Sequence, residues 1–320
     1  MKEMIWAYML KLSDHMWEDE HSPNFNLYAP PHVYQPSNST EIEVWDDIVR
    51  FTAARKYNMM LIDVGDGIRY ESHPEISAPN AWDKDFLRTK LNEMRALGLE
   101  PIPKLNFSAA HDTWLKKYRR MLATPTYYRV CSDLIREVAE VFDYPRLFHI
   151  GMDEESTTAQ DQAGWEMAVV RNGELWWHDL FYIAGECEKH GARAWMWSDY
   201  MWWNLDMFLK KMPTSILQSN YHYGYLKDYE KKPGYGYMQI ESYRILDKYG
   251  FDQVPCVSNW KNCYNADQVL GLCKAECDPR RIHGYINASW VLTYDRAYYE
   301  LRNNAHLLYL ARKECYPETL

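Results

Sequence analysis

The chain has 320 residues, of which 47% are hydrophobic and 25% charged, and this composition excludes disorder as the main state because it can bury a large core. The 45 acidic residues outnumber the 36 Lys and Arg residues, giving a net charge of −9 without any basic run, which argues against nucleic acid or an anionic membrane as a partner. No apolar run reaches the roughly 18 residues that a transmembrane helix needs.

Short β-forming runs alternate with longer amphipathic segments along the chain. The predicted strands are 4–10, 59–64, 100–107, 147–152, 193–198, 215–220, 253–258 and 282–289. The predicted helices are 41–57, 83–97, 126–142, 175–190, 205–211, 238–249, 266–277 and 295–313. This repeated alternation predicts a single-domain (β/α)₈ barrel over residues 1–320. An open doubly wound sheet is the competing architecture, but it usually has a glycine-rich first turn, and residues 11–15 contain no glycine.

Aromatic residues are unusually frequent, with 14 Trp and 26 Tyr. Their large apolar faces can pack on the C–H face of a sugar while their polar tips bond outward. The alternative is a large aromatic core, and composition alone does not separate the two.

Polar side chains gather at the C-terminal ends of the predicted strands. Because side chains alternate between the faces of a strand, Lys104 and Asn106 share one face, and Trp195, Trp197 and Asp199 share another that points inward. Burying such groups unpaired is costly. Barrel active sites are built at this end of the strands, so we expect a functional pocket there.

The sharpest motif is His-Ile-Gly-Met-Asp-Glu-Glu at 149–155, where three carboxylates end a buried strand. Glycoside hydrolysis needs two carboxyl groups with different roles, one of which donates a proton. Adjacent acids push their pKa values apart by like-charge repulsion. A run of acids at a helix N-terminus is the alternative interpretation. The position after a barrel strand favours Asp153 and Glu154 as a catalytic pair.

This motif resembles the His-x-Gly-Gly-Asp-Glu motif of family 20 glycoside hydrolases, the β-N-acetylhexosaminidases, which also ends strand four of a (β/α)₈ barrel. The resemblance implies that Glu154 is the general acid and base and that Asp153 orients and polarises the 2-acetamido group. In that family the acetamide oxygen is the nucleophile and an oxazolinium intermediate forms, so no carboxylate attacks carbon. The implied reaction removes a terminal β-linked N-acetylhexosamine, or a related amino sugar, with retention.

Other strand ends resemble the same family more weakly. Residues 103–106, followed by His111, resemble its strand-three stretch, and residues 197–199, 258–260 and 287–290 resemble the ends of strands five, seven and eight. The substrate contacts implied by position are Asn106, His111, Trp197, Asp199, Trp260 and Trp290. For the tyrosine that holds the acetamide oxygen, Tyr264 is the first choice and Tyr221 the second.

Two histidines lie near the acidic pair. His111 is expected to bridge to Asp153 or Glu154, and the alternative is an ordinary loop histidine. His149 lies one pleat below the pair on the same strand face, which favours a hydrogen-bonded positioning residue over a catalytic base.

The chain departs from the family's pattern. Met152 replaces the second glycine of the motif, and Lys104 and Asn106 stand where the family has two acids. After strand one the family has an arginine, whereas this chain has Lys11 and His15. This chain can therefore share the fold and the reaction type of the family while it acts on a different substrate.

Three alternatives remain at this point. One is a glycosidase for sugars without an acetamide, which needs a carboxylate nucleophile about 5 to 5.5 Å from Glu154. Asp199, Asp63 and Glu155 are the candidates for that role. The second is a carbohydrate-binding barrel that has lost catalysis, and the third is an unrelated barrel enzyme.

The remaining expectations concern partners and compartment. Neither a zinc-protease nor a nucleotide-loop motif is present, so we assign no metal and no cofactor, and the expected partner is a carbohydrate. The seven scattered cysteines predict reduced thiols. No signal peptide is read at the N-terminus, so we expect a cytoplasmic protein, or an exported one if a leader was trimmed. Homo-oligomer contact through the aromatic loops stays open.

Overall fold

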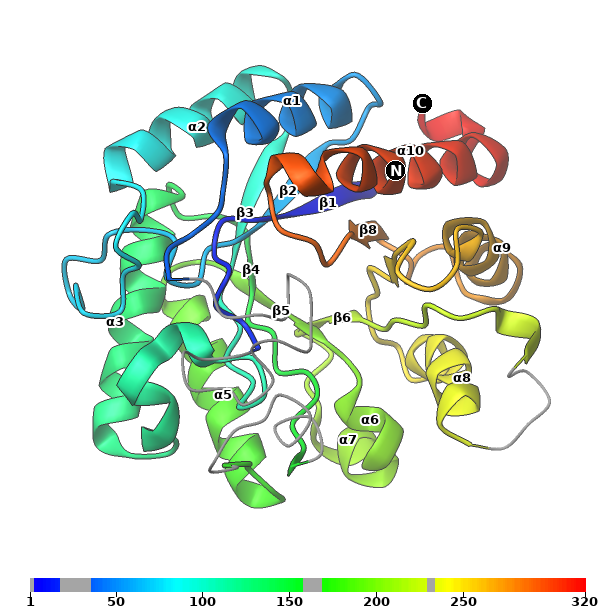
Figure 1. Cartoon of the computed structure of the whole chain (residues 1–320). Helices are drawn as coiled ribbons and strands as arrows, with labels where there is room; N and C mark the ends of the chain where they lie inside the picture. The colour runs from blue at the N-terminus through cyan, green and yellow to red at the C-terminus, as the bar shows by residue number, and fades with distance from the viewer. Residues whose placement is uncertain (1–2, 18–35, 158–168, 229–233) are drawn as a thin grey trace.

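A computed structural model describes residues 3–17, 36–157, 169–228 and 234–320. Parallel strands form the centre of the molecule and helices surround them (Figure 1). The strands are β1 (Ile5–Lys11), β2 (Met59–Asp63), β3 (Glu100–Lys104), β4 (Leu147–His149), β5 (Arg193–Trp197), β6 (Leu217–Ser219), β7 (Cys256–Val257) and β8 (Gly284–Ala288). Their order is β6-β5-β4-β3-β2-β1-β8-β7. Bridges Gln218–Gln253 and Tyr221–Cys256 join the two ends, so the predicted (β/α)₈ barrel is confirmed.

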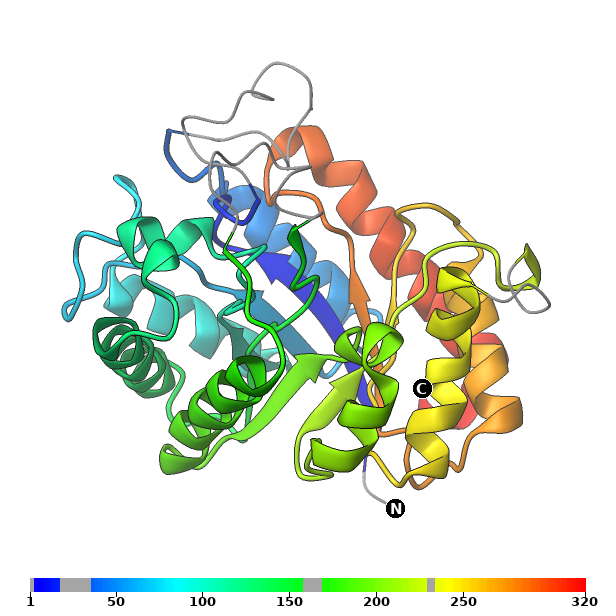
Figure 2. The same ribbon diagram turned by 90° about the horizontal axis from the view of Figure 1, so that it is seen from below.

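The helices form the outer layer, which the second view shows around the strands (Figure 2). They are α1 (Ile42–Ala53), α2 (Lys84–Ala96), α3 (Pro125–Val141), α5 (Glu174–Lys189), α6 (Tyr200–Trp203), α7 (Leu205–Lys211), α8 (Tyr235–Lys248), α9 (Asn265–Glu276) and α10 (Tyr298–Cys315). The short 3₁₀ helices are η1 (Thr113–Met121), η2 (Leu226–Asp228), η3 (Asp295–Ala297) and η4 (Pro317–Thr319). The predicted helix 205–211 coincides with α7, whereas η1 and α6 were not predicted.

Helix α3 shows how the sequence sets one of these elements. The Thr124 side chain accepts a hydrogen bond from the Tyr127 N–H (3.2 Å), which satisfies one of the free donors of the first turn. Pro125 begins the helix, where its missing N–H costs nothing. Leu134 and Val138, four residues apart, are fully buried and fix the face that packs on the barrel.

Several strands are shorter than predicted, and for β4 the reason lies in the backbone. β4 ends at His149 and not at 152, because Gly151 and Met152 have φ angles of 72° and 69° and leave the extended conformation. β3 likewise ends at Lys104 and not at 107. The acidic residues therefore lie on a loop that turns out of the barrel.

The strand register places ionisable residues side by side at the end of the barrel. Lys11 is opposite Asp63, Asp63 is opposite Lys104, and Lys104 is opposite His149. Lys104 Nζ donates to Asp63 Oδ2 at 2.8 Å, and both side chains are buried. Burial lowers the pKa of Lys11 to about 8. A row of buried charged side chains, Lys11, Asp63 and Lys104, therefore lies below the mouth of the barrel.

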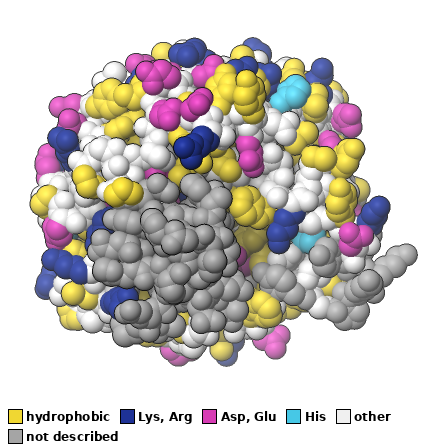
Figure 3. Space-filling view, viewed as in Figure 1, with side chains coloured by type: hydrophobic (Ala, Val, Ile, Leu, Met, Phe, Trp, Pro, Cys, Tyr) yellow, Lys and Arg dark blue, Asp and Glu magenta, His cyan; other side chains and the backbone are white. Residues whose placement is uncertain are grey.

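The surface of the described residues is mixed in charge. On the face shown in Figure 3, acidic and basic side chains are interspersed, in agreement with the lack of basic runs. Within the described ranges, no helix combines the length and apolar character needed to cross a membrane. All seven cysteines are free thiols.

Candidate active site

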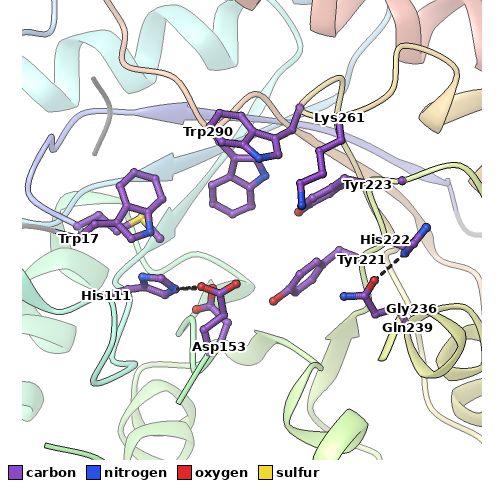
Figure 4. A pocket seen from close by; sticks show the side chains of 14 residues that line it. Trp17, His111, Asp153, Tyr221, His222, Tyr223, Gly236, Gln239, Lys261 and Trp290 are labelled. Carbon is purple, nitrogen blue, oxygen red and sulfur yellow. Dashed lines mark hydrogen bonds and ion pairs between the residues drawn. The ribbon is translucent and has the colours of Figure 1, made fainter. Parts of the chain in front are cut away.

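A cavity of about 310 Å³ opens at the C-terminal ends of the strands, where the sequence predicts a site (Figure 4). Its walls come from the loops after β1, β3, β4, β6, β7 and β8 and from the start of α8. The lining residues are Met16, Trp17, His111, Asp153, Glu154, Tyr221, His222, Tyr223, Gly224, Gly236, Gln239, Trp260, Lys261 and Trp290. Five of these residues are Trp or Tyr, and two are acids.

Asp153 is buried at the floor of this cavity and is held by cationic and amide donors. Asn106 Nδ2 donates to its Oδ1 at 2.9 Å, and His111 Nε2 lies 3.3 Å from its Oδ2. Burial by itself raises the pKa of this carboxyl, but the His111 imidazolium, Lys104 and Asn106 outweigh burial and hold it at about 2. Lys104 and Asn106, which depart from the family's acids, thus keep Asp153 ionised.

Glu154 shares the same histidine but faces solvent. His111 Nε2 lies 3.1 Å from Glu154 Oε2, and 45% of the Glu154 side chain is exposed. Burial lowers the pKa of His111, but the two carboxylates outweigh this effect and raise it to about 10. The expected bridge from His111 to the acidic pair is present in the structure, and the histidine is a cation at neutral pH.

This arrangement predicts how stability depends on pH. A pKa raised from 6.5 to about 10 gives a stabilisation that is complete below pH 6.5 and is lost as pH rises through 10. We therefore expect the wild-type melting temperature to fall between pH 6.5 and 10 more steeply than that of His111→Gln. The measurement is thermal unfolding across this range, with His190→Gln at the end of α5 as control. Parallel profiles for wild type and His111→Gln would contradict the prediction.

The backbone of the motif is unusual at three positions. Gly151, Met152 and Glu154 have φ angles of 72°, 69° and 51°, in the left-handed region. A Cβ on Gly151 would lie 1.9 Å from Asn106 Oδ1, so only glycine fits beside the amide that holds Asp153. Met152, which replaces the motif's second glycine, occupies the same region at a cost in strain. The turn it makes carries Glu154 out toward the cavity.

Asp199 lies beneath this turn. Its Oδ2 accepts a hydrogen bond from the Glu154 N–H at 2.7 Å, and the side chain is buried. Burial, together with the negative charges of Asp153 and Glu154, raises the pKa of Asp199 well above its ordinary value. Asp199 is not among the residues that line the cavity, and its hydrogen bond holds the Glu154 backbone.

His149 is buried at the end of β4, before the loop that carries the two acids. Its Nδ1 accepts the Gly151 N–H at 3.1 Å, and its ring centroid lies 4.4 Å from that of Trp197. Burial, together with the positive charge of Lys104, lowers the pKa of His149 well below its ordinary value, so the ring is neutral. These contacts fit the expected positioning role.

The predicted aromatic residues divide into three groups. Trp260, Trp290 and Tyr221 line the cavity. Trp197 is fully buried behind the wall, where its ring centroid lies 6.0 Å from that of Tyr221. Tyr264 is 59% exposed and is not among the lining residues, so the order of preference between the two tyrosines is reversed in favour of Tyr221.

Some residues of the site were missed by sequence reasoning. Trp17, Gln239 and Lys261 line the cavity, and Arg171 supports it from below. The sequence offered two signals for these residues. Lys261 is a charged residue next to Trp260, and Glu155, the third acid of the motif, needs a counterion if it is buried.

Arg171 is that counterion. It is buried, and its Nε and Nη2 each donate to a separate oxygen of Glu155 at 2.9 Å, while Nη1 donates to Asp179 Oδ2 at 3.1 Å. Arg171 Nη2 also donates to the Phe107 carbonyl at 2.6 Å, and the Ala109 N–H donates to Glu155. Glu155 therefore ties the loop after β4 to the loop after β3.

The carboxylates considered as nucleophiles are all engaged elsewhere. Glu155 is held by Arg171, Asp63 is paired with Lys104, and Asp199 accepts the Glu154 N–H. Among the lining residues of the described chain, Asp153 and Glu154 are the only carboxylates. Within the described residues, the cavity therefore offers a substrate two acids in different environments.

The fold is shared with solved enzymes, although no family model and no curated protein matches the sequence. A chitobiase from Flavobacterium johnsoniae is 15% identical with a TM-score of 0.61, covering 98% of this chain and 52% of its own. A family 20 exo-β-N-acetylglucosaminidase from Vibrio harveyi, solved with N-acetylglucosamine, is 13% identical with a TM-score of 0.62 and coverages of 99% and 58%. This chain thus spans just over half the length of both enzymes.

Dispersin B is similar in length as well as in fold. It is 13% identical with a TM-score of 0.60, and the match covers 98% of this chain and 99% of that one. At these identities the likeness shows the fold alone. The fold neighbours include enzymes of family 20, the same family whose strand-four motif the sequence resembles.

Proposed function

We propose that this barrel is a retaining glycoside hydrolase that removes a terminal β-linked N-acetylhexosamine, or a related amino sugar, with the substrate's own acetamide as nucleophile. The observation that carries the proposal is the arrangement of the two acids. Asp153 is buried and ionised beside His111 and Asn106, while its neighbour Glu154 reaches into the cavity. The neighbours with the same fold and the resemblance of the motif add support.

In the proposed reaction, Glu154 gives its proton to the leaving oxygen, and the His111 cation then stabilises the carboxylate that remains. The acetamide oxygen attacks the anomeric carbon and expels the leaving group. The Asp153 carboxylate accepts the acetamide N–H and offsets the positive charge of the oxazolinium. Glu154 then takes a proton from the water that opens the intermediate. In this proposal Tyr221, which lines the cavity, holds the acetamide oxygen.

This proposal makes a prediction about Asp153. We expect Asp153→Asn to lower kcat for 4-nitrophenyl N-acetyl-β-glucosaminide by roughly 10²-fold, because the neutral amide no longer offsets the developing positive charge. Hydrolysis rates of wild type and variant provide the measurement, and Asp206→Asn on the exposed side of α7 is the matched control.

The matching glucoside, which lacks the acetamide, separates this reaction from one with a carboxylate nucleophile. We expect wild type to leave 4-nitrophenyl β-glucoside intact. Faster turnover of the glucoside than of the acetamido sugar would overturn the substrate-assisted mechanism. The absence of turnover of any glycoside by folded protein would overturn the assignment as a hydrolase.

A further inference from the structure

Trp17 lines the cavity next to His111. It lies in the loop after β1, and its ring centroid is 6.0 Å from that of His111, with the two ring planes at 86°. Figure 4 shows Trp17 close to His111, whose ring points toward Asp153. Aromatic pairs prefer such an edge-to-face arrangement, and an indole ring also attracts a cation such as the His111 imidazolium. Trp17 therefore packs against the histidine that the two acids share.

Lys11 lies against the Trp17 ring. Its side chain is buried at the end of β1, and its Nζ is 4.1 Å from the centroid of the Trp17 ring. Asp63, its neighbour in the strand register, is paired with Lys104 at 2.8 Å. Burial lowers the pKa of Lys11 to about 8, so most of it is charged at pH 7. A cation–π contact is stronger when the cation is desolvated, so this contact holds the indole in place.

The ring of His111 needs a group that orients it. A functional histidine is commonly oriented by a hydrogen bond at the ring nitrogen that faces away from the reacting groups. The Nε2 atom of His111 faces Asp153 and Glu154, whereas its Nδ1 is buried and has no hydrogen-bond partner among the described residues. The backbone is fixed separately, because the His111 N–H donates to the Ser108 carbonyl at 3.1 Å. Contact with Trp17 can therefore supply the orientation that Nδ1 does not.

We infer that Trp17 orients the His111 ring toward the two acids and that Lys11 fixes Trp17, so that both are positioning residues of the site. Their role in catalysis rests on the proposed function, whereas their effect on His111 can be measured without turnover. The contacts run from Lys11 through Trp17 to His111, which in turn engages both carboxylates. A ring that is held less firmly spends less time close to both carboxylates, so its pKa falls.

The first test is an NMR titration of His111 in protein labelled with ¹³C-histidine, with the signal assigned by its loss in His111→Gln. Wild type is expected to titrate at a pKa of about 10, and Trp17→Leu about one pH unit lower. Lys11→Met gives the sharper result, because two effects predict opposite signs. Removal of a nearby positive charge by itself raises the pKa of an imidazole, whereas loss of its orientation toward the acids lowers it. We expect the pKa of His111 to fall in both variants.

Two matched controls make the same changes outside the cavity lining. Trp203→Leu on α6 and Lys210→Met on α7 replace exposed residues, and both should leave the titration of His111 unchanged. Trp17→Phe keeps an aromatic ring and should retain most of the wild-type pKa, and thermal unfolding verifies that each variant is folded. A pKa of His111 that is unchanged or raised in Trp17→Leu overturns the inference. A fall in Trp17→Leu together with a rise in Lys11→Met overturns the part assigned to Lys11.

The second test separates positioning from substrate binding. Lys11 is not among the residues that line the cavity, so Lys11→Met should lower kcat for 4-nitrophenyl N-acetyl-β-glucosaminide by about fivefold and change KM by less than about twofold. Lys11→Arg should retain most of the activity, because a guanidinium also stacks on an aromatic face. A higher KM with unchanged kcat in Lys11→Met would overturn its positioning role. Absence of turnover by wild type overturns the proposed function, and the titration of His111 then still decides the inference.

Discussion

Glu154→Gln is expected to lower kcat/KM for 4-nitrophenyl N-acetyl-β-glucosaminide by about 10²- to 10⁴-fold, because the amide cannot donate a proton to the leaving oxygen. Glutamine keeps the size of the side chain, and the Glu154 N–H still donates to Asp199. The fold should therefore be retained while the proton donor is lost. Steady-state release of nitrophenol at several pH values gives the measurement.

A change of leaving group makes this test specific to the proton donor. A 2,4-dinitrophenyl glycoside leaves as a stable anion and needs less protonation, so its kcat/KM should fall far less in Glu154→Gln. Glu188→Gln, on the exposed side of α5, is the matched control and should behave as wild type. An equal loss for both leaving groups would show that Glu154 does not act as the acid.

The second large effect is expected on stability. Arg171→Met should lower the free energy of unfolding by roughly 3–5 kcal/mol, because it leaves the buried carboxylates of Glu155 and Asp179 without a counterion. For a domain of this size the loss corresponds to a melting temperature lower by roughly 10 °C. Thermal and urea unfolding followed by circular dichroism provide the measurement.

Two further variants control for this effect. Arg129→Met lies on the exposed side of α3 and should change stability by no more than about 0.5 kcal/mol. Arg171→Lys keeps the charge but loses the two parallel hydrogen bonds to Glu155, so an intermediate loss is expected. A melting temperature unchanged in Arg171→Met would refute the role of this residue as a buried counterion.

The barrel could be predicted because its signals are local. Hydrophobic periodicity and helix-end residues mark each strand and helix within a window of about ten residues. The ends of the strands were harder to predict. β4 ends at His149 because Gly151 and Met152 adopt left-handed conformations, and the residue type of Met152 does not indicate one. Strand alternation continued past this point therefore made β4 three residues too long.

The floor of the candidate site was predicted more fully than its walls. Asp153 and Glu154 were found because adjacent acids after a barrel strand form a contiguous motif. Tyr264 was ranked above Tyr221, although Tyr221 is the one that lines the cavity, because the choice depends on which loop folds over the cavity. Arg171 could not be paired with Glu155 from the sequence, since a buried ion pair between two loops leaves no periodic signal.

The two sides of the cavity come from different parts of the chain, and this has an evolutionary consequence. The groups assigned to bond cleavage lie between Asn106 and Glu155, whereas the wall from Tyr223 to Trp290 is assigned to recognition. If the proposed function holds, a substitution in the later segment would change sugar binding and leave the acids in place. Substrate specificity in such a barrel could then change through substitutions in the C-terminal loops while the catalytic residues stay the same.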